Sequence, residues 1–499
     1  MRWIVFICVV FVLSCNDYSD IEEVELRTGD PEFAIPLVHA SVSLESIFNE
    51  TETEDTELII YPDNSMSLIY SGDVLMQMAD DILPPLPGNL PFQVTQKMDT
   101  VTLLFQRLDI RKASLTGDKL TIGAASNHPG DVHVHVDFLS LTKDGDTLTF
   151  DIPLEYDGSL PVENTAMAEL DGLTLDLYEN SFIIRYEATD EDGNEVDLEY
   201  LQFLWNEMTY DYMEGYFSKN TVNIPGDAID IEVYEQWITG RLYFEDPTVE
   251  VIVDNSFGIP VRAQVNKLRF VGRQNQIDSL ESPQNDSINF LYPDLDEVGE
   301  VKKNVIEYNS NNSNIEDIIN IQPRRLEYDI DAIGNPDEDS TIIGFLTDSS
   351  FIRINVRVEL PLSGWANDFA ARDTLDFEIE KIDEIKNAEF KMVFSNGMPL
   401  ELTSQVYLTD ADYEVIDSMF IGELLTVGSP DVNAEGEAVG QRSTIRFETF
   451  SSERLDALDQ VRHAILEVGF LTKDAPQKSV TITSEDILDF RVGAKFKFK

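Results

Sequence analysis

Short stretches of alternating apolar and polar residues constrain this chain more than any other feature of its sequence. The alternation is clearest in residues 132–137 and 261–265, and it recurs less regularly in residues 249–253. A period of two places every second side chain on one face, which is typical of a half-buried strand. Turn-forming pairs such as Asp144-Gly145 separate the stretches. The sequence therefore predicts a mostly-β chain of antiparallel sheets with few short helices.

One local pattern recurs three times: a strand-like stretch, an Asn, a Pro and a second strand-like stretch. The copies carry Asn127 and Pro129, Asn255 and Pro260, and Asn396 and Pro399. Proline cannot donate to a sheet ladder, so it must lie at a strand end or a break. Asparagine accepts the unusual backbone angles of a tight bend. Each copy is therefore predicted to be a strand that bends and continues, once per module.

This repeated pattern resembles the late-embryogenesis-abundant type 2 family. Residues 255–261 and 396–400 match the family motif best, and residues 127–132 match it more weakly. The resemblance covers about 20 residues in each module. It implies tandem immunoglobulin-like antiparallel β-sandwiches without an active site. Chance similarity among β-proteins is the alternative interpretation.

The mature chain is long enough for three or four domains. We predict β-sandwich modules at residues 31–165, 166–330 and 331–499, with an Asn- and Ser-rich insertion or long loop near 275–320. Short helices are expected at 44–48, 315–319 and 453–462. The last strand is predicted to place apolar side chains on one face and three lysines on the other, namely Lys495, Lys497 and Lys499.

The N-terminal residues have the features of an export signal. Arg2 precedes an apolar run over residues 3–13, which is too short to span a bilayer. The run ends in Val12-Leu13-Ser14-Cys15, which resembles the lipobox of bacterial lipoproteins. That resemblance implies a signal peptide at residues 1–14 and an acylated Cys15 as the new N-terminus. The alternative is ordinary secretion.

An acidic, apolar-poor stretch follows at residues 15–30, which predicts a flexible tether. Acidic residues behind a lipidated Cys also resemble the surface-export signal of Bacteroidota lipoproteins. The expected location is the outer membrane, held by lipid. The surface-facing leaflet is favoured slightly over the periplasmic one.

Composition excludes several classes of function. Ninety-four acidic residues against 35 basic ones give a net charge of −59, which disfavours nucleic acid and anionic lipid as partners because both carry phosphate. After removal of residues 1–14 the acylated Cys15 is the last cysteine left, which excludes intrachain disulfides, thiol catalysis and cysteine-based zinc sites.

Metal-binding patterns are weak in this sequence. His133, His135 and Asp137 share one strand face, and two His residues spaced in this way can bind zinc or copper. We favour a polar outer strand face, because the chain has only five His residues. The acidic stretches 294–299 and 190–194 resemble calcium loops but lack the required ligands, so we interpret them as acidic turns. We expect no metal and no cofactor.

Two further residue sets have competing interpretations. Aromatic residues between 200 and 244 could stack on sugars, but we favour core packing. The second set is Ser or Thr preceded by Asp, which resembles the O-glycosylation sequon of Bacteroidota; turn formation is the alternative. Its members are Thr100, Thr147, Ser279, Ser287, Ser340, Thr374 and Ser418.

Together these features predict a lipid-anchored protein that binds or scaffolds and is not an enzyme. The expected partners are the bilayer, through acylated Cys15, and another outer-membrane or surface protein. A lipid-handling sandwich, a surface glycan-binding protein and a hydrolase are the alternatives, because paired carboxylates occur by chance in so acidic a chain.

Overall fold

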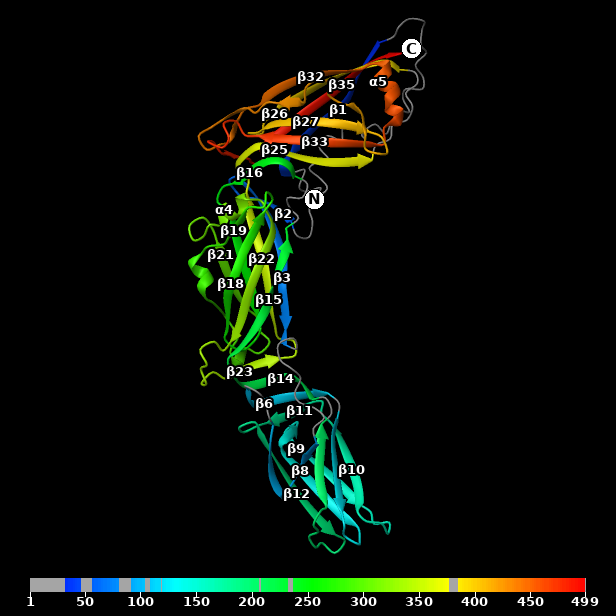
Figure 1. Cartoon of the computed structure of the whole chain (residues 1–499), viewed down its shortest axis with the longest axis vertical. Coiled ribbons are helices and arrows are strands. Elements are labelled where there is room, and N and C mark those ends of the chain that lie inside the picture. The colour runs from blue at the N-terminus through cyan, green and yellow to red at the C-terminus, as the bar shows by residue number, and fades with distance from the viewer. Residues whose placement is uncertain are drawn as a thin grey trace.

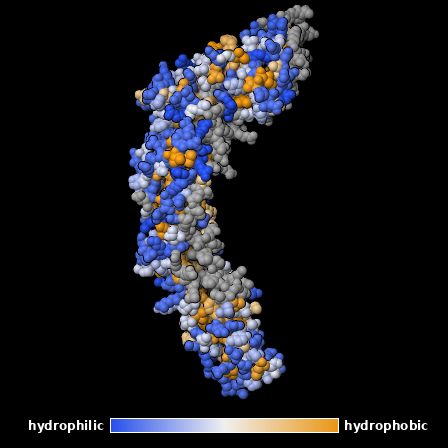
Figure 2. Space-filling view, in the orientation of Figure 1, coloured by the Kyte–Doolittle hydropathy of each residue, from blue (hydrophilic) through white to orange (hydrophobic). Residues whose placement is uncertain are grey.

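The computed structural model describes residues 32–45, 56–79, 91–103, 108–117, 119–205, 208–231, 237–376 and 385–498. The chain is mostly β: of the residues described, 63% lie in strands and 6% in helices. Six sheets of four or more strands form three β-sandwiches, which lie end to end in an elongated molecule (Figures 1 and 2). The predicted mostly-β fold, with tandem antiparallel sandwiches and few short helices, is confirmed.

The terminal module holds both ends of the described chain. One sheet has the order β1 (Glu32–Ser43), β35 (Ile487–Phe498), β26 (Ile385–Asn396) and β32 (Arg442–Phe450). The other has the order β16 (Trp237–Phe244), β25 (Ser363–Asp376), β33 (His463–Leu471), β27 (Glu401–Thr409) and β28 (Val415–Ser418). Short strands complete the module: β29 (Leu425–Val427), β30 (Asp431–Val432), β31 (Ala438–Val439) and β34 (Val480–Thr481).

The middle module follows below it in Figure 1. Its first sheet has the order β2 (Thr56–Ile60), β3 (Met66–Met78), β24 (Phe351–Pro361), β17 (Thr248–Asn255) and β21 (Lys302–Tyr308). Its second sheet has the order β15 (Asn220–Asp230), β22 (Pro323–Gly334), β18 (Val261–Gly272) and β19 (Ile277–Ser279), with β20 (Ile288–Phe290) also on β18. The stretch 275–320, expected to be an insertion or long loop, thus supplies β19, β20 and β21 to the two sheets.

The distal module lies at the opposite end of the molecule from the terminal module (Figure 1). Its first sheet has the order β4 (Pro91–Gln93), β13 (Tyr200–Trp205), β7 (Lys119–Ser126) and β10 (Val162–Glu169). The second contains β5 (Met98–Thr102), β12 (Ser181–Asp190), β8 (Val132–Lys143) and β9 (Asp146–Leu154). Four strands extend this second sheet toward the middle module: β11 (Leu173–Asp176), β6 (Leu108–Gly117), β14 (Met208–Phe217) and β23 (Gly344–Thr347).

The eight principal strands pair in the same order in all three modules. Numbered along the chain within a module, strands 1, 8, 3 and 6 form one sheet, and strands 2, 7, 4 and 5 form the other. The eight strands are β4, β5, β7, β8, β9, β10, β12 and β13 in the distal module, and β3, β15, β17, β18, β19, β21, β22 and β24 in the middle module. They are β1, β25, β26, β27, β28, β32, β33 and β35 in the terminal module.

This strand order is that of an eight-stranded jelly roll, the sandwich built from two Greek keys. An immunoglobulin-like sandwich, which the sequence resemblance implied, keeps its first two strands in one sheet. Here the first two strands lie in opposite sheets, and the first strand pairs with the last.

The three modules are nested in one another. Strands 1 and 2 of the terminal module, β1 and β25, are separated by the whole of the middle and distal modules. Strands 1 and 2 of the middle module, β3 and β15, are separated by the distal module. The chain also returns once to the terminal module to form β16. We predicted from the sequence that the modules follow one another along the chain. The strand pairing instead combines segments that are distant in sequence, such as Glu32 with Lys497.

The predicted bent strands are present, once in each module. β7 leads to β8, β17 to β18 and β26 to β27, and each bend carries the chain from one sheet to the other. We call the connections kink loops: residues 127–131, 256–260 and 397–400. At two of them a fully buried Asn fixes the bend, since the side-chain oxygen of Asn255 accepts from the Phe257 N–H at 3.0 Å and that of Asn396 accepts from the Met398 N–H at 2.9 Å.

In the distal kink loop the equivalent residue is Ser126 and not Asn127. Ser126 is buried, and its hydroxyl accepts from the His128 N–H at 3.1 Å. Asn127 is exposed and donates to Glu199. The weaker sequence match of this copy thus reflects a shift of the bend by one residue.

The distal and middle modules share one continuous apolar core. Its largest fully buried side chains include Phe138, Phe182, Phe203 and Trp205. Trp205 meets Phe182 at 5.3 Å and Phe203 at 5.5 Å between ring centroids, both edge to face. Such pairs contribute about 1 kcal/mol each beyond their buried area.

The expected helices are short, as predicted. α4 (Ile315–Asn320) matches the helix expected at residues 315–319. α5 (Ser452–Ala457) and the following 3-10 turn η4 (Leu458–Gln460) cover most of the helix expected at residues 453–462. Ser451 caps α5 by accepting from the Arg454 N–H. The helix expected at residues 44–48 lies mostly outside the described residues.

Candidate functional site

The candidate site is the free end of the distal module, which we call the distal tip. Four loops form it: residues 94–97, 127–131, 155–161 and 191–199. In the other two modules the chain between strands 1 and 2 forms the next module, which extends from this end. In the distal module a four-residue loop makes this connection, so the end faces outward at the bottom of Figure 1.

Hydrogen bonds tie the four loops into one surface. The contacts are Lys97 Nζ to Glu195 Oε2 at 2.5 Å, Asn127 Nδ2 to Glu199 Oε2 at 2.5 Å, and the Tyr156 N–H to Asp131 Oδ1 at 2.6 Å. Exposed apolar side chains lie among these polar groups, namely Tyr156 and Leu160. The tip is therefore a preformed surface with both polar and apolar contact groups.

The distal tip is strongly acidic. Its loops contain Lys97 and His128 against eight carboxylates: Asp131, Glu155, Asp157, Glu191, Asp192, Glu195, Asp197 and Glu199. The hydrogen bond to Glu195 raises the pKa of Lys97. Hydrogen bonds from Asn194 lower the pKa of Asp190 at the base of the last loop. At neutral pH the tip therefore has a negative field, which complements a basic surface.

The histidine strand predicted as a weak metal candidate lies on the outer face of the sheet, beside the tip. His133 and His135 both contact Asp151 Oδ1, at 3.1 and 2.8 Å. The other ring nitrogen of His135 lies 3.1 Å from Asp137, which in turn pairs with Arg185 at 2.5 Å. These side chains form a ladder of alternating charge across β9, β8 and β12.

The ladder favours a charged imidazole more than a metal ion. The hydrogen bond to Asp151, helped by the nearby charge of Asp137, raises the pKa of His135 against a smaller opposing effect of burial. A metal needs the neutral ring nitrogens that these carboxylates engage. Among the residues that the structure describes, no group of three or more His, Cys, Asp or Glu side chains could hold a metal ion.

Sequence reasoning missed two members of this ladder, Asp151 and Arg185. Both lie on neighbouring strands, directly opposite His135 and Asp137 in the register. The Asp144-Gly145 turn would have located the β8–β9 hairpin, but a bulge between Phe138 and Thr142 shifts the register beyond it. An uninterrupted hairpin would have placed Asp151 opposite Phe138 instead.

Both calcium-like stretches are acidic turns, as interpreted from the sequence. Asp190 turns one carboxylate oxygen toward the backbone, where it accepts from the Asp192 N–H at 3.0 Å and the Asn194 N–H at 2.8 Å. In the other stretch Glu297 accepts from the Asp294 N–H at 3.0 Å and pairs with Lys302 at 2.6 Å.

The aromatic residues between 200 and 244 pack mainly inward. Phe203, Trp205 and Phe217 are buried, and Tyr243 stacks on Trp365 with 5.4 Å between ring centroids. The core-packing interpretation is confirmed for Phe203, Trp205 and Phe217, while Tyr243 is half-buried. Tyr234 and the side chain of Trp237 lie outside the described part of the chain.

The candidate O-glycosylation residues lie mostly at the surface. Ser418 is half-buried, and the exposed ones are Thr100, Thr147, Ser279, Ser287, Ser340 and Thr374. Exposure permits modification, which stays a prediction. The alternative has support at Ser340, because Asp339 accepts from the Thr341 N–H at 2.9 Å and so organises a turn there.

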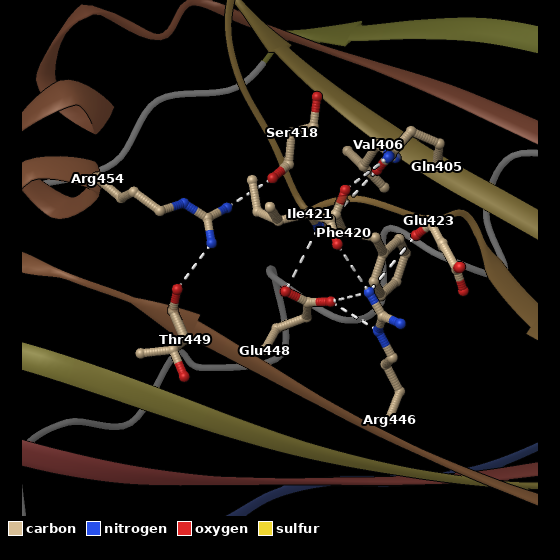
Figure 3. A network of polar contacts seen from close by, with 10 residues as sticks. All are labelled: Gln405, Val406, Ser418, Phe420, Ile421, Glu423, Arg446, Glu448, Thr449 and Arg454. Carbon is tan, nitrogen blue, oxygen red and sulfur yellow. Dashed lines mark hydrogen bonds and ion pairs between the residues drawn. The ribbon is translucent and has the colours of Figure 1, made fainter.

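A polar network lies on the inner side of β32, an edge strand of the terminal module (Figure 3). Arg446 and Glu448 of β32 lie on the inward face, and Arg446 Nε donates to Glu448 at 2.6 Å. Arg446 also donates to the carbonyl of Ile421 at 3.1 Å. Charges that point inward from an edge strand discourage pairing with another chain. We therefore interpret this network as structural.

The predicted lipidation residue, Cys15, lies outside the described residues. Among the helices that the structure describes, none has the length and apolar character needed to cross a membrane.

No protein-family model matches this chain, and no curated protein matches its sequence. Among solved structures, it is similar to a candidate secreted protein from Parabacteroides distasonis, with 11% identity, a TM-score of 0.28, and coverage of 93% of this chain and 99% of the other. A structure of infectious bursal disease virus, Gx strain, aligns at 9% identity and a TM-score of 0.15 over 94% of this chain and 81% of the other. TM-scores this low establish no shared fold or function.

Proposed function

We propose that this protein is a non-catalytic lipoprotein, anchored in the outer membrane, that holds a binding tip away from the bilayer. The nested fold carries this proposal. It places both ends of the described chain in the terminal module and the distal tip at the far end of the molecule (Figure 1). A chain anchored at Cys15 would therefore attach through the terminal module and present the tip to a partner.

The partner is proposed to be another outer-membrane or surface protein with a basic contact surface. The joined loops of the distal tip and their excess of carboxylates support a protein partner of complementary charge. Nucleic acid is disfavoured by the same field.

Anchoring is tested by Cys15→Ser. Two acyl chains provide stable membrane attachment, so the variant is expected in the soluble fraction after a high-salt wash, whereas the parent stays with the membranes. A variant that remains in the washed membranes would contradict the anchor at Cys15.

Binding at the tip is tested by site-specific photo-crosslinking in intact cells. A photoreactive residue at Leu160, in the distal tip, is expected to give one discrete adduct. The matched control is Val305, which is similarly exposed on the side of the middle module. Absence of an adduct at Leu160, or equal adducts at both positions, would argue against the tip as the binding site.

A further inference from the structure

The outer face of the sheet β1-β35-β26-β32 differs in charge from the rest of the molecule. We call it the basic face and define it by Lys391, Ile445, Phe447, Arg491 and Lys495. Lys391 lies opposite Phe447, and the strands place Arg491 and Lys495 on the same outward side. Its acidic members are Glu389, which lies directly opposite Lys495, and Asp489, which accepts a hydrogen bond from Ser41. Cations therefore outnumber carboxylates here, within a chain of net charge −59.

Many cations on other sheets have carboxylate partners. Arg353 pairs with Asp254 at 2.7 Å, and Arg372 pairs with Glu467 at 2.7 Å. By contrast, neither Lys391 nor Arg491 forms an ion pair with any residue that the structure describes. Their charge is available to an anionic partner, because neither side chain is held in an ion pair with a carboxylate of the described chain.

Exposed apolar side chains accompany these cations. Ile445 and Phe447 are each 55% exposed, and Lys391 Nζ lies 5.8 Å from the centre of the Phe447 ring. Ile421 is also 55% exposed and approaches the same edge, where its N–H donates to Glu448. Cations around exposed apolar and aromatic groups suit the boundary between lipid headgroups and acyl chains.

The position of the basic face fits a bilayer. β1 belongs to this sheet and begins at Glu32, seventeen residues after Cys15, so the intervening chain spans at most about 60 Å. Salt screens the acidic charge of the remote modules over about 8 Å at physiological ionic strength. The positive charge of the basic face, and not the net charge of the chain, therefore determines the electrostatic interaction with a bilayer at contact.

We propose that the basic face lies flat on the anionic phospholipid headgroups of the membrane that holds the anchor. This inference rests on the proposed lipid anchoring, and it adds an orientation. Lys391, Arg491 and Lys495 would contact phosphate, while Ile445 and Phe447 would enter the interface. A terminal module that contacts the membrane through the basic face as well as through the acylated N-terminus would fix the direction in which the distal tip points.

The test uses the full-length protein with Cys15→Ser, which carries no acyl chain, so the face is measured apart from the anchor. Co-flotation is measured with vesicles of phosphatidylethanolamine and phosphatidylglycerol, and with vesicles of phosphatidylcholine. Each cation near an anionic surface contributes about fivefold in affinity. Lys391→Glu, Arg491→Glu and Lys495→Glu together are therefore expected to lower binding to the anionic vesicles about a hundredfold.

The control carries the same change in charge on the distal module: Lys112→Glu, Lys119→Glu and Lys143→Glu, all at exposed positions. It is expected to bind like the parent, and unchanged thermal melts verify that each variant is folded. Equal binding of the parent to both vesicle types, or an equal loss in the two triple variants, would overturn the inference. Release of the acylated parent by salt would instead contradict the anchor, so the two failures are distinguishable.

Discussion

The kink loops of the middle and distal modules occupy the same place in the same jelly roll, yet their surroundings are opposite. In the middle module Phe257 is 3% exposed, and Gly258 pairs with Phe345 of β23 in the joint to the distal module. In the distal module the kink loop belongs to the outward tip, where Asn127 and Pro129 are exposed.

This difference shows that one bent-strand element serves either as a joint or as a free end. The insertion of a further module determines which of the two roles the element has, because the end of a module that bears an inserted module becomes buried. The backbone bend itself needs only one buried acceptor, supplied by Asn255 in one case and Ser126 in the other. Substitutions at equivalent positions should therefore have unequal costs.

The largest difference is expected between Phe257→Asp and His128→Asp, two equivalent positions. Phe257→Asp removes a buried ring and places a charge in the core, which should cost about 4 kcal/mol or more. His128→Asp should cost less than about 0.5 kcal/mol, because it changes a partly exposed side chain. Chemical denaturation of both variants measures the difference. Similar losses would show that the distal loop is as well packed as the joint.

Asn396→Ala should have the next largest effect. The Asn396 amide donates to the carbonyls of Leu400 at 2.8 Å and Gly428 at 3.1 Å, and accepts from the Met398 N–H. Its removal leaves buried groups unsatisfied, at an expected cost of about 3 kcal/mol. Ser126→Ala removes one accepted bond, from the His128 N–H, and one long donated bond, to the Asp197 carbonyl at 3.4 Å. It should cost about 1 kcal/mol. A larger loss at Ser126, in the same denaturation experiment, would contradict this ranking.

Gly258→Ala tests the joint itself. A methyl group at Gly258 would overlap the Phe345 ring, which is fully buried. Such overpacking should cost about 2 kcal/mol. Gly130→Ala is the control in the distal kink loop, because its methyl group would meet only the ring of His128, at 3.3 Å. An unchanged melting temperature for Gly258→Ala would show that the joint is loosely packed.

The smallest effect concerns pH at the distal module. The native pKa of His135 is raised above 6.5, mainly by its hydrogen bond to Asp151. The stabilisation is therefore complete below the unfolded value and is lost as pH rises through the native value. The difference in melting temperature between the parent and Asp151→Asn should shrink from about pH 5.5 to about pH 8.5. A difference that is constant with pH would mean that the ladder does not titrate.

Local features were the ones that could be predicted from sequence. The face pattern of the last strand is an example: Val492 and Ala494 are buried, while Lys495 is exposed. The bends near Pro260 and Pro399 are another, because proline and asparagine act within a few residues. The buried aromatic side chains of β13 follow from the same alternation.

Strand partners were not predictable in this way. Alternation tells which side chains share a face, but it carries no information about which strand lies alongside. The pairing of β1 with β35 joins the two ends of the described chain, and the pairing of β24 with β3 crosses the entire distal module. The jelly-roll order and the nesting follow from these long-range pairings.

The sequence by itself determined that this chain forms β-sandwiches with a bent strand in each, because strand alternation and proline geometry are local properties. Only the tertiary structure decided that the sandwiches are nested, that Asp151 meets His135, and that Lys391 and Arg491 share an outward face. Each of these depends on sheet register between segments distant in sequence. Net charge, summed over the whole chain, gave no sign of a basic face, because the fold gathers its few cations from separate strands.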